Sequence, residues 1–145
     1  MSHPAFIVDD SSFCRFVTRR MLDDSGLFSP ILELEDGLDL LALVDDPLRF
    51  DSLVGGRWVR SLVLLDQSLA RSSGLETIAG LLERIHRGFD EDRLAIVACT
   101  ASDDPVLHEQ LLDSGLVRDC LPKPLRQHQL PDLARYCETL SYCHC

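Results

Sequence analysis

Short apolar runs of β-strand length recur along the chain, at residues 5–8, 31–34, 62–65, 94–98 and 117–121. Between them, apolar residues are spaced three and four apart, as on one face of a helix. The first helical segment lies between Ser11 or Ser12, either of which can cap its start, and Gly26, which can end it. The other helical segments have their apolar positions at Leu38, Leu41 and Val44; Leu75, Ile78, Ala79, Leu82 and Ile85; Leu107 and Leu111; and Leu130, Leu133, Ala134 and Cys137.

Strands that are apolar throughout and alternate with helices predict a parallel sheet covered by helices on both faces. We therefore expect an α/β, doubly wound fold. In such sheets the ligand crevice lies at the carboxyl ends of the strands, so the residues just after each apolar run are the candidates for chemistry.

One segment departs from this alternation. Residues 45–60 are longer than a usual connection between a helix and a strand. Gly55 and Gly56 predict a turn there, within a small hairpin or a loop. We expect Trp58 to be a packing residue of this segment.

Composition narrows the class of protein. The chain has 145 residues, of which 46% are hydrophobic, which fits one globular domain with its own core. It has neither an apolar run long enough to cross a bilayer nor a secretory signal at its N-terminus, so we expect a cytoplasmic protein. With 14 basic and 24 acidic residues, its net charge of −10 disfavours direct binding to nucleic acid or to anionic membranes.

The cysteines do not predict a disulfide framework. Cys14, Cys99, Cys120 and Cys137 fall within apolar patterns, so we interpret them as reduced core residues. The remaining two lie in the tail at 142–145, where a zinc site would need more ligands than the tail supplies. We expect residues 141–145 to be a flexible, exposed terminus.

Conspicuous polar residues follow four of the five apolar runs. Asp9 and Asp10 follow the first, Asp66 the third, Thr100 the fourth and Lys123 the fifth. Three convergent carboxylates repel one another unless a cation relieves them, and Mg²⁺ prefers carboxylate oxygens. Beside Mg²⁺, a lysine and a hydroxyl, the Asp66 carboxylate can attack phosphorus as a nucleophile.

These pieces resemble the receiver domains of two-component response regulators, over residues 5–140. The matching segments are Phe-Ile-Val-Asp-Asp-Ser-Ser at 6–12, Leu-Val-Leu-Leu-Asp-Gln-Ser-Leu at 62–69, Ser-Gly-Leu-Glu at 73–76, Val-Ala-Cys-Thr-Ala at 97–101 and Leu-Pro-Lys-Pro at 121–124. The resemblance implies a flavodoxin-like fold with five parallel strands in the order 2-1-3-4-5, and residues 1–145 would form one receiver domain.

The resemblance also implies roles for the polar residues. Asp66 would be phosphorylated by a sensor histidine kinase or a phosphotransfer protein. Asp10 would bind Mg²⁺ directly and Asp9 largely through water, with the backbone carbonyl of Ser68 as a further ligand. Thr100 would move toward the phosphoryl group, and Lys123 would pair with it.

The expected function is therefore a response regulator that catalyses its own phosphorylation and dephosphorylation but is not an enzyme on an outside substrate. The kinase is expected near Phe13, Cys14 and Val17. No effector domain is expected after the last helix, so output would use protein contacts, phosphorelay or a homodimer. The surface for output would combine the helix around Leu107, the strand 117–121, which contains Cys120, and the helix around Leu133.

Departures from the family pattern leave alternatives open. Cys120 occupies the switch position, where the family usually has an aromatic residue or histidine, and Leu69 replaces a common proline. A receiver-like binding module that signals without phosphorylation is therefore the second hypothesis. A haloacid-dehalogenase-type phosphohydrolase would need an acid where Ser68 stands, and a flavodoxin would need a hydroxyl-rich phosphate loop after the first strand.

Overall fold

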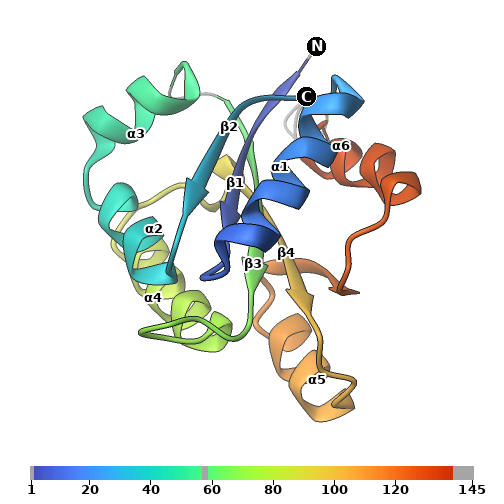
Figure 1. The fold of residues 1–145 in the computed structure, drawn as a ribbon. Helices are drawn as coiled ribbons and strands as arrows, with labels where there is room; N and C mark the ends of the chain where they lie inside the picture. Colours follow the sequence, from blue (N-terminus) through green and yellow to red (C-terminus); the bar gives the residue numbers. More distant parts are fainter. Residues whose placement is uncertain (1, 57–58, 139–145) are drawn as a thin grey trace.

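The computed structural model describes residues 2–56 and 59–138, which form a parallel sheet between two layers of helices (Figure 1). The strands are β1 (His3–Val8), β2 (Phe28–Leu34), β3 (Ser61–Asp66), β4 (Leu94–Thr100) and β5 (Val117–Pro122). They pair in the order β2-β1-β3-β4-β5, and every pair is parallel. The predicted fold class and strand order are confirmed.

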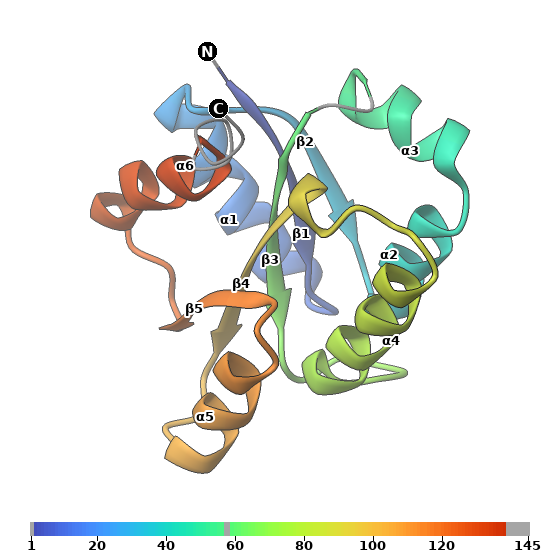
Figure 2. The ribbon, with the colours of Figure 1, turned by 180° about the vertical axis from the view of Figure 1, so that it is seen from behind.

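Within the described ranges, six helices cover the sheet, in two unequal groups. They are α1 (Ser12–Ser25), α2 (Gly37–Val44), α3 (Pro47–Val54), α4 (Gly74–His86), α5 (Pro105–Asp113) and α6 (Leu130–Glu138), with 3₁₀ turns at Glu91–Arg93 and Gln127–Gln129. Helices α1 and α6 lie on one face and α2 to α5 on the other (Figure 2). Among the described residues, no helix is long and apolar enough to cross a membrane.

The central strands are buried on both sides, which explains their uninterrupted apolar sequences. In β1, Phe6 and Val8 pack with the core beneath α2 to α5, whereas Ala5 and Ile7 pack with the core beneath α1 and α6. The same alternation runs through β3 and β4. A sheet held this way from both faces gives its carboxyl edge a fixed geometry.

Within residues 45–60, the turn predicted at Gly55 and Gly56 is present, but residues 47–54 before it form a helix, which the prediction of a small hairpin or loop missed. The segment contains α3, which Asp46 caps by accepting a hydrogen bond from the backbone N–H of Arg49. Pro47 occupies the first turn, and Gly55 ends the helix with a left-handed φ of 90°. Phe50 and Val54, four residues apart, are both buried, so α3 is a short amphipathic helix whose apolar face packs against the core.

The prediction for the cysteines is only half correct. All four described cysteines are free thiols, and Cys99 and Cys137 are buried. Cys14 and Cys120 are only half-buried, because Cys14 lines a surface cavity beside α1 and Cys120 lies on the edge strand β5. Trp58 and the tail at 139–145 lie outside the described residues.

Candidate functional site

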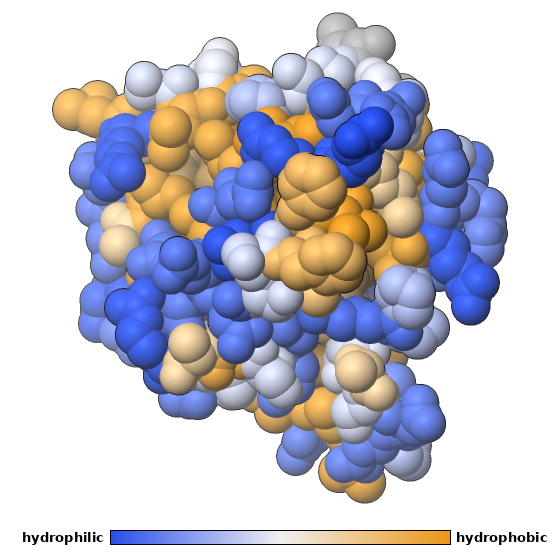
Figure 3. Space-filling model, viewed as in Figure 1, coloured by the Kyte–Doolittle hydropathy of each residue, from blue (hydrophilic) through white to orange (hydrophobic). Residues whose placement is uncertain are grey.

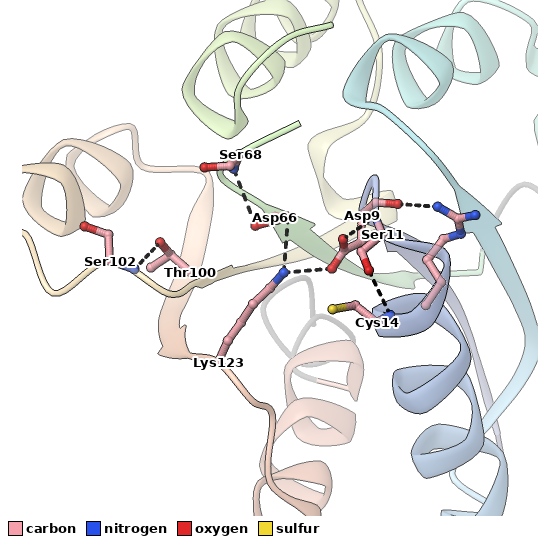
Figure 4. A network of polar contacts seen from close by, with 9 residues as sticks. Asp9, Ser11, Cys14, Asp66, Ser68, Thr100, Ser102 and Lys123 are labelled. Carbon is pink, nitrogen blue, oxygen red and sulfur yellow. Dashed lines mark hydrogen bonds and ion pairs between the residues drawn. The ribbon is translucent and has the colours of Figure 1, made fainter. Parts of the chain in front are cut away.

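The predicted polar residues gather at the carboxyl edge of the sheet. Asp9 and Asp10 directly follow β1, Asp66 ends β3, Thr100 ends β4, and Lys123 directly follows β5. Together they line one cavity of about 490 Å³, whose wall also includes Ser11, Gln67, Ser68, Ala101, Ser102 and Leu107. Figure 4 shows Asp9, Asp66 and Lys123 pointing toward one another.

Three carboxylates form the acidic centre of this cavity. One oxygen from each of Asp9, Asp10 and Asp66 lies within 4.8 Å of the others. Asp9 and Asp66 are buried, with exposed fractions of 6% and 8%, whereas Asp10 is exposed. Two of the three carboxylates are therefore buried at the edge of the sheet, and the third is open to solvent.

Lys123 bridges the two buried carboxylates. Its Nζ lies 2.8 Å from Asp9 Oδ2 and 3.1 Å from Asp66 Oδ2. Burial lowers the pKa of Lys123, but the hydrogen bond to Asp9 and the charge of Asp66 outweigh burial and raise it. The ammonium is therefore a permanent charge at neutral pH.

The ionised carboxylate of Asp66 has few hydrogen-bond donors around it. Burial raises its pKa above 3.8, although the charge and hydrogen bond of Lys123 act in the opposite direction. Its one backbone donor, the N–H of Ser68, lies 3.4 Å from Oδ1. A buried carboxylate with so few donors gains more from an added cation than a fully hydrogen-bonded one.

The turn after β1 is fixed by local hydrogen bonds. Asp9 Oδ1 accepts from the backbone N–H of Ser11 at 2.9 Å, and Ser11 Oγ caps α1 by accepting from Cys14 N. Arg15 Nη1 donates to the backbone carbonyl of Asp9 at 2.7 Å. Sequence reasoning missed Arg15, because an arginine on an amphipathic helix carries no signal that distinguishes it from a solvent-facing residue.

Thr100 forms part of the wall rather than part of the charge network. Its side chain is buried, and its Oγ1 accepts a hydrogen bond from the backbone N–H of Ser102 at 3.0 Å. Its carbonyl accepts from the backbone N–H of Lys123 at 3.0 Å, which joins the ends of β4 and β5. Cys120 lies on β5 and packs, as does Leu107, against the core beneath α2 to α5.

The donor set fits a hard divalent cation. Mg²⁺ prefers carboxylate oxygens and usually keeps several waters, and Asp9, Asp10 and Asp66 offer carboxylates beside a side open to solvent. The single ammonium of Lys123 offsets one of three negative charges, so the centre retains a deficit of positive charge.

Comparison with known proteins agrees with this geometry. A family model described as the response regulator receiver domain matches residues 5–135. No curated protein sequence matches the chain.

Solved structures resemble the fold over nearly its whole length. A two-component response regulator from Cytophaga hutchinsonii is 19% identical, with a TM-score of 0.76, 92% of this chain covered and 95% of that one. A response regulator receiver protein from Dyadobacter fermentans is 21% identical, with a TM-score of 0.74 and coverages of 93% and 98%. The Vibrio cholerae chemotaxis protein CheY4 is 20% identical, with a TM-score of 0.66 and coverages of 94% and 99%.

Proposed function

Because the chain belongs to the response regulator receiver family, a family of signalling modules in two-component systems, we propose that it accepts a phosphoryl group on Asp66. The donor would be a sensor histidine kinase or a phosphotransfer protein. The observation that carries the proposal is the state of Asp66: a buried carboxylate with a raised pKa, 3.1 Å from a lysine ammonium and grouped with two further carboxylates.

The chemistry follows from these positions. A carboxylate oxygen of Asp66 attacks phosphorus while the bond between phosphorus and the donor nitrogen breaks, which leaves an acyl phosphate. Lys123, which already contacts Asp66, would donate to a phosphoryl oxygen and offset its charge. Thr100 would exchange its hydrogen bond with Ser102 N for one to the phosphoryl group.

A divalent cation completes this proposal. Asp9, Asp10 and Asp66, with the backbone carbonyl of Ser68, would hold Mg²⁺. When bound, the ion supplies positive charge to the oxygens of the transferred phosphoryl group. The chain would act on itself, through phosphotransfer and slow dephosphorylation, rather than on an outside substrate.

The surface of α1 supports docking of the phosphodonor there. Phe13, Phe16 and Val17 are 73%, 60% and 40% exposed, and apolar side chains gather over α1 in Figure 3. An apolar cavity of about 370 Å³ lies beside them, and its lining includes Phe13, Cys14, Val17, Leu125 and Asp66. A partner bound on this surface would lie next to the acceptor carboxylate. The surface around α5, β5 and α6 remains our candidate for output contacts or a homodimer.

Labelling with a small phosphodonor tests the proposal without a kinase. The wild-type protein is expected to gain an acid-stable but base-labile phosphate that requires Mg²⁺, and Asp66→Asn should gain none. Asp39→Asn, which removes a half-exposed carboxylate of α2, is the matched control and should label normally. Full labelling of Asp66→Asn would overturn the assignment of the acceptor.

The alternative of a module that signals without phosphorylation has its own test. Beryllofluoride mimics an aspartyl phosphate, so a phosphorylatable receiver should change its amide NMR spectrum around 100–104 when Mg²⁺ and beryllofluoride are added together. A spectrum that does not respond would favour the module.

A further inference from the structure

Asp36, an aspartate outside the acidic centre, contacts the loop that follows Asp66. It directly precedes α2 as its N-cap residue, and it is fully buried, with an exposed fraction of 0%. An ionised carboxylate is costly to bury unless several donors satisfy it. The donors that surround Asp36 therefore show what it holds in place.

The carboxylate of Asp36 joins the start of α2 to the loop at 67–73. Oδ1 accepts from the backbone N–H of Leu38 at 3.0 Å and from Ser72 Oγ at 2.6 Å. Oδ2 accepts from the backbone N–H of Arg71 at 2.8 Å. Only the bond from Leu38 is needed to cap α2; the other two come from a segment 35 or 36 residues away.

Hydrogen bonds within the loop connect Arg71 and Ser72 to Ser68. The backbone N–H of Leu69 donates to the carbonyl of Ser72 at 3.2 Å, and Ser68 forms an antiparallel bridge with Ser73. Gly74 N donates to the carbonyl of Gln67 at 2.8 Å, directly after Asp66. Ser68 is thus linked by a short hydrogen-bonded path to the residues that Asp36 holds.

Close packing behind the loop removes slack from this arrangement. A Cβ on Gly37 would lie 1.7 Å from Thr77 Oγ1, so the first turns of α2 and α4 meet without space between them. Thr77 Oγ1 in turn donates to the carbonyl of Ser73 at 3.0 Å. Asp36 therefore sits on a rigid base formed by two helix starts.

We propose that Asp36 is a positioning residue for the cation pocket: through Arg71 and Ser72 it holds the 67–73 loop, and with it Ser68, in the wall of the cavity that the three carboxylates line. The inference rests on the proposed function, because it assumes that the pocket binds Mg²⁺. It assigns to Asp36 a role that capping α2 does not require.

Two variants separate the clamp from the helix cap. Ser72→Ala removes one donor on the loop and leaves α2 untouched. Asp36→Asn keeps an oxygen for Leu38 but presents an amide that cannot accept hydrogen bonds from Ser72 and Arg71 at the same time. Ser72→Thr, which retains the hydroxyl, and Asp39→Asn, which removes only the exposed contact with Arg71, are the controls.

Calorimetric titration with Mg²⁺ in the absence of a phosphodonor is the readout, and urea unfolding checks that each variant is folded. Loss of one hydrogen bond should weaken Mg²⁺ binding about three- to tenfold in Ser72→Ala, and more in Asp36→Asn. Both controls should bind Mg²⁺ as the wild type does.

The outcomes distinguish this inference from the function on which it rests. If Ser72→Ala and Asp36→Asn lose stability but bind Mg²⁺ with wild-type affinity, Asp36 is a helix cap only and the inference is overturned. If Asp36→Asn does not fold, Ser72→Ala decides alone. If the wild type itself neither binds Mg²⁺ nor accepts phosphate, the proposed function fails first and the inference falls with it.

Discussion

Two buried aspartates on either side of the same loop behave in opposite ways. Asp36 accepts three hydrogen bonds, which outweigh the effect of burial and lower its pKa below 3.8. Asp66 accepts one long backbone hydrogen bond and one from Lys123, and burial raises its pKa. As whole residues, Asp36 and Asp66 are 0% and 8% exposed, and burial raises the pKa of each; only Asp36 has enough donors to reverse that effect.

The difference teaches how one loop serves two purposes. A carboxylate with a full set of donors is a structural anchor, because its charged form is already stabilised and has little to gain from a new partner. A carboxylate left short of donors retains the capacity to bind a cation or to attack an electrophile. Asp36 is the anchor and contacts the 67–73 loop from the start of α2. Asp66 is the carboxylate short of donors and directly precedes the loop.

The largest expected effect is at Lys123, the charge on which Asp66 depends. Lys123→Met should lower the rate of labelling by a small phosphodonor about 100-fold, because it removes a fixed charge from the site of the transferred phosphoryl group. Lys123 is the only lysine in the chain; its other basic residues are arginines. Lys123→Arg should also be labelled slowly, because a planar guanidinium cannot replace a compact ammonium between Asp9 and Asp66.

Initial labelling rates at saturating Mg²⁺ measure both lysine variants. A Lys123→Met rate within threefold of the wild type would show that Asp66 does not need this partner.

The next effect sets the two aspartates against each other in stability. Asp36→Ala should lower the free energy of unfolding by about 2–4 kcal/mol, because it removes a helix cap and leaves the Arg71 N–H and Ser72 hydroxyl without their acceptor. Asp66→Asn should change it by less than about 1 kcal/mol in either direction, because its charge is poorly satisfied.

Urea unfolding, monitored by far-UV circular dichroism, measures the two free energies. Equal losses for both variants would remove the distinction between anchor and acceptor.

The smallest effect concerns pH. Because folding lowers the pKa of Asp36, its ionisation stabilises the fold above the ordinary value of 3.8, and this contribution is lost as the pH falls through the lowered, folded-state value. For Asp66 the sign is reversed: its pKa is raised, so the contribution is fully present below the ordinary value of 3.8 and is lost as the pH rises through the raised, folded-state value. Asp36→Asn should therefore flatten, and Asp66→Asn steepen, the fall in stability between about pH 5 and pH 2.

Repeating the urea titrations across this pH range gives the slopes. Slopes for both variants that match the wild type would contradict the opposite pKa shifts.

Much of the fold could be predicted from local patterns. Apolar runs and helical spacing located the five strands and the helices other than α3, and the Ser11 cap and the Gly26 end of α1 lie where the sequence places them. Helix α3 was missed because the pair Gly55-Gly56 suggested a turn, whereas Asp46 and Pro47 carried a helix-start signal. The helix is held in place by Phe50, which packs against Phe6 and Phe89. These contacts form only in the tertiary structure.

The sequence by itself determined which residues meet at the site. The carboxyl ends of parallel strands share one edge, so Asp9, Asp10, Asp66, Thr100 and Lys123 could be placed together from strand positions alone. Only the tertiary structure decided how each is held. The contacts of Asp36 with Arg71 and Ser72, of Arg15 with the Asp9 carbonyl and of Lys123 with two carboxylates depend on side-chain directions and on the path of loops. Periodicity encodes which face a residue occupies, but not which distant donor it meets there.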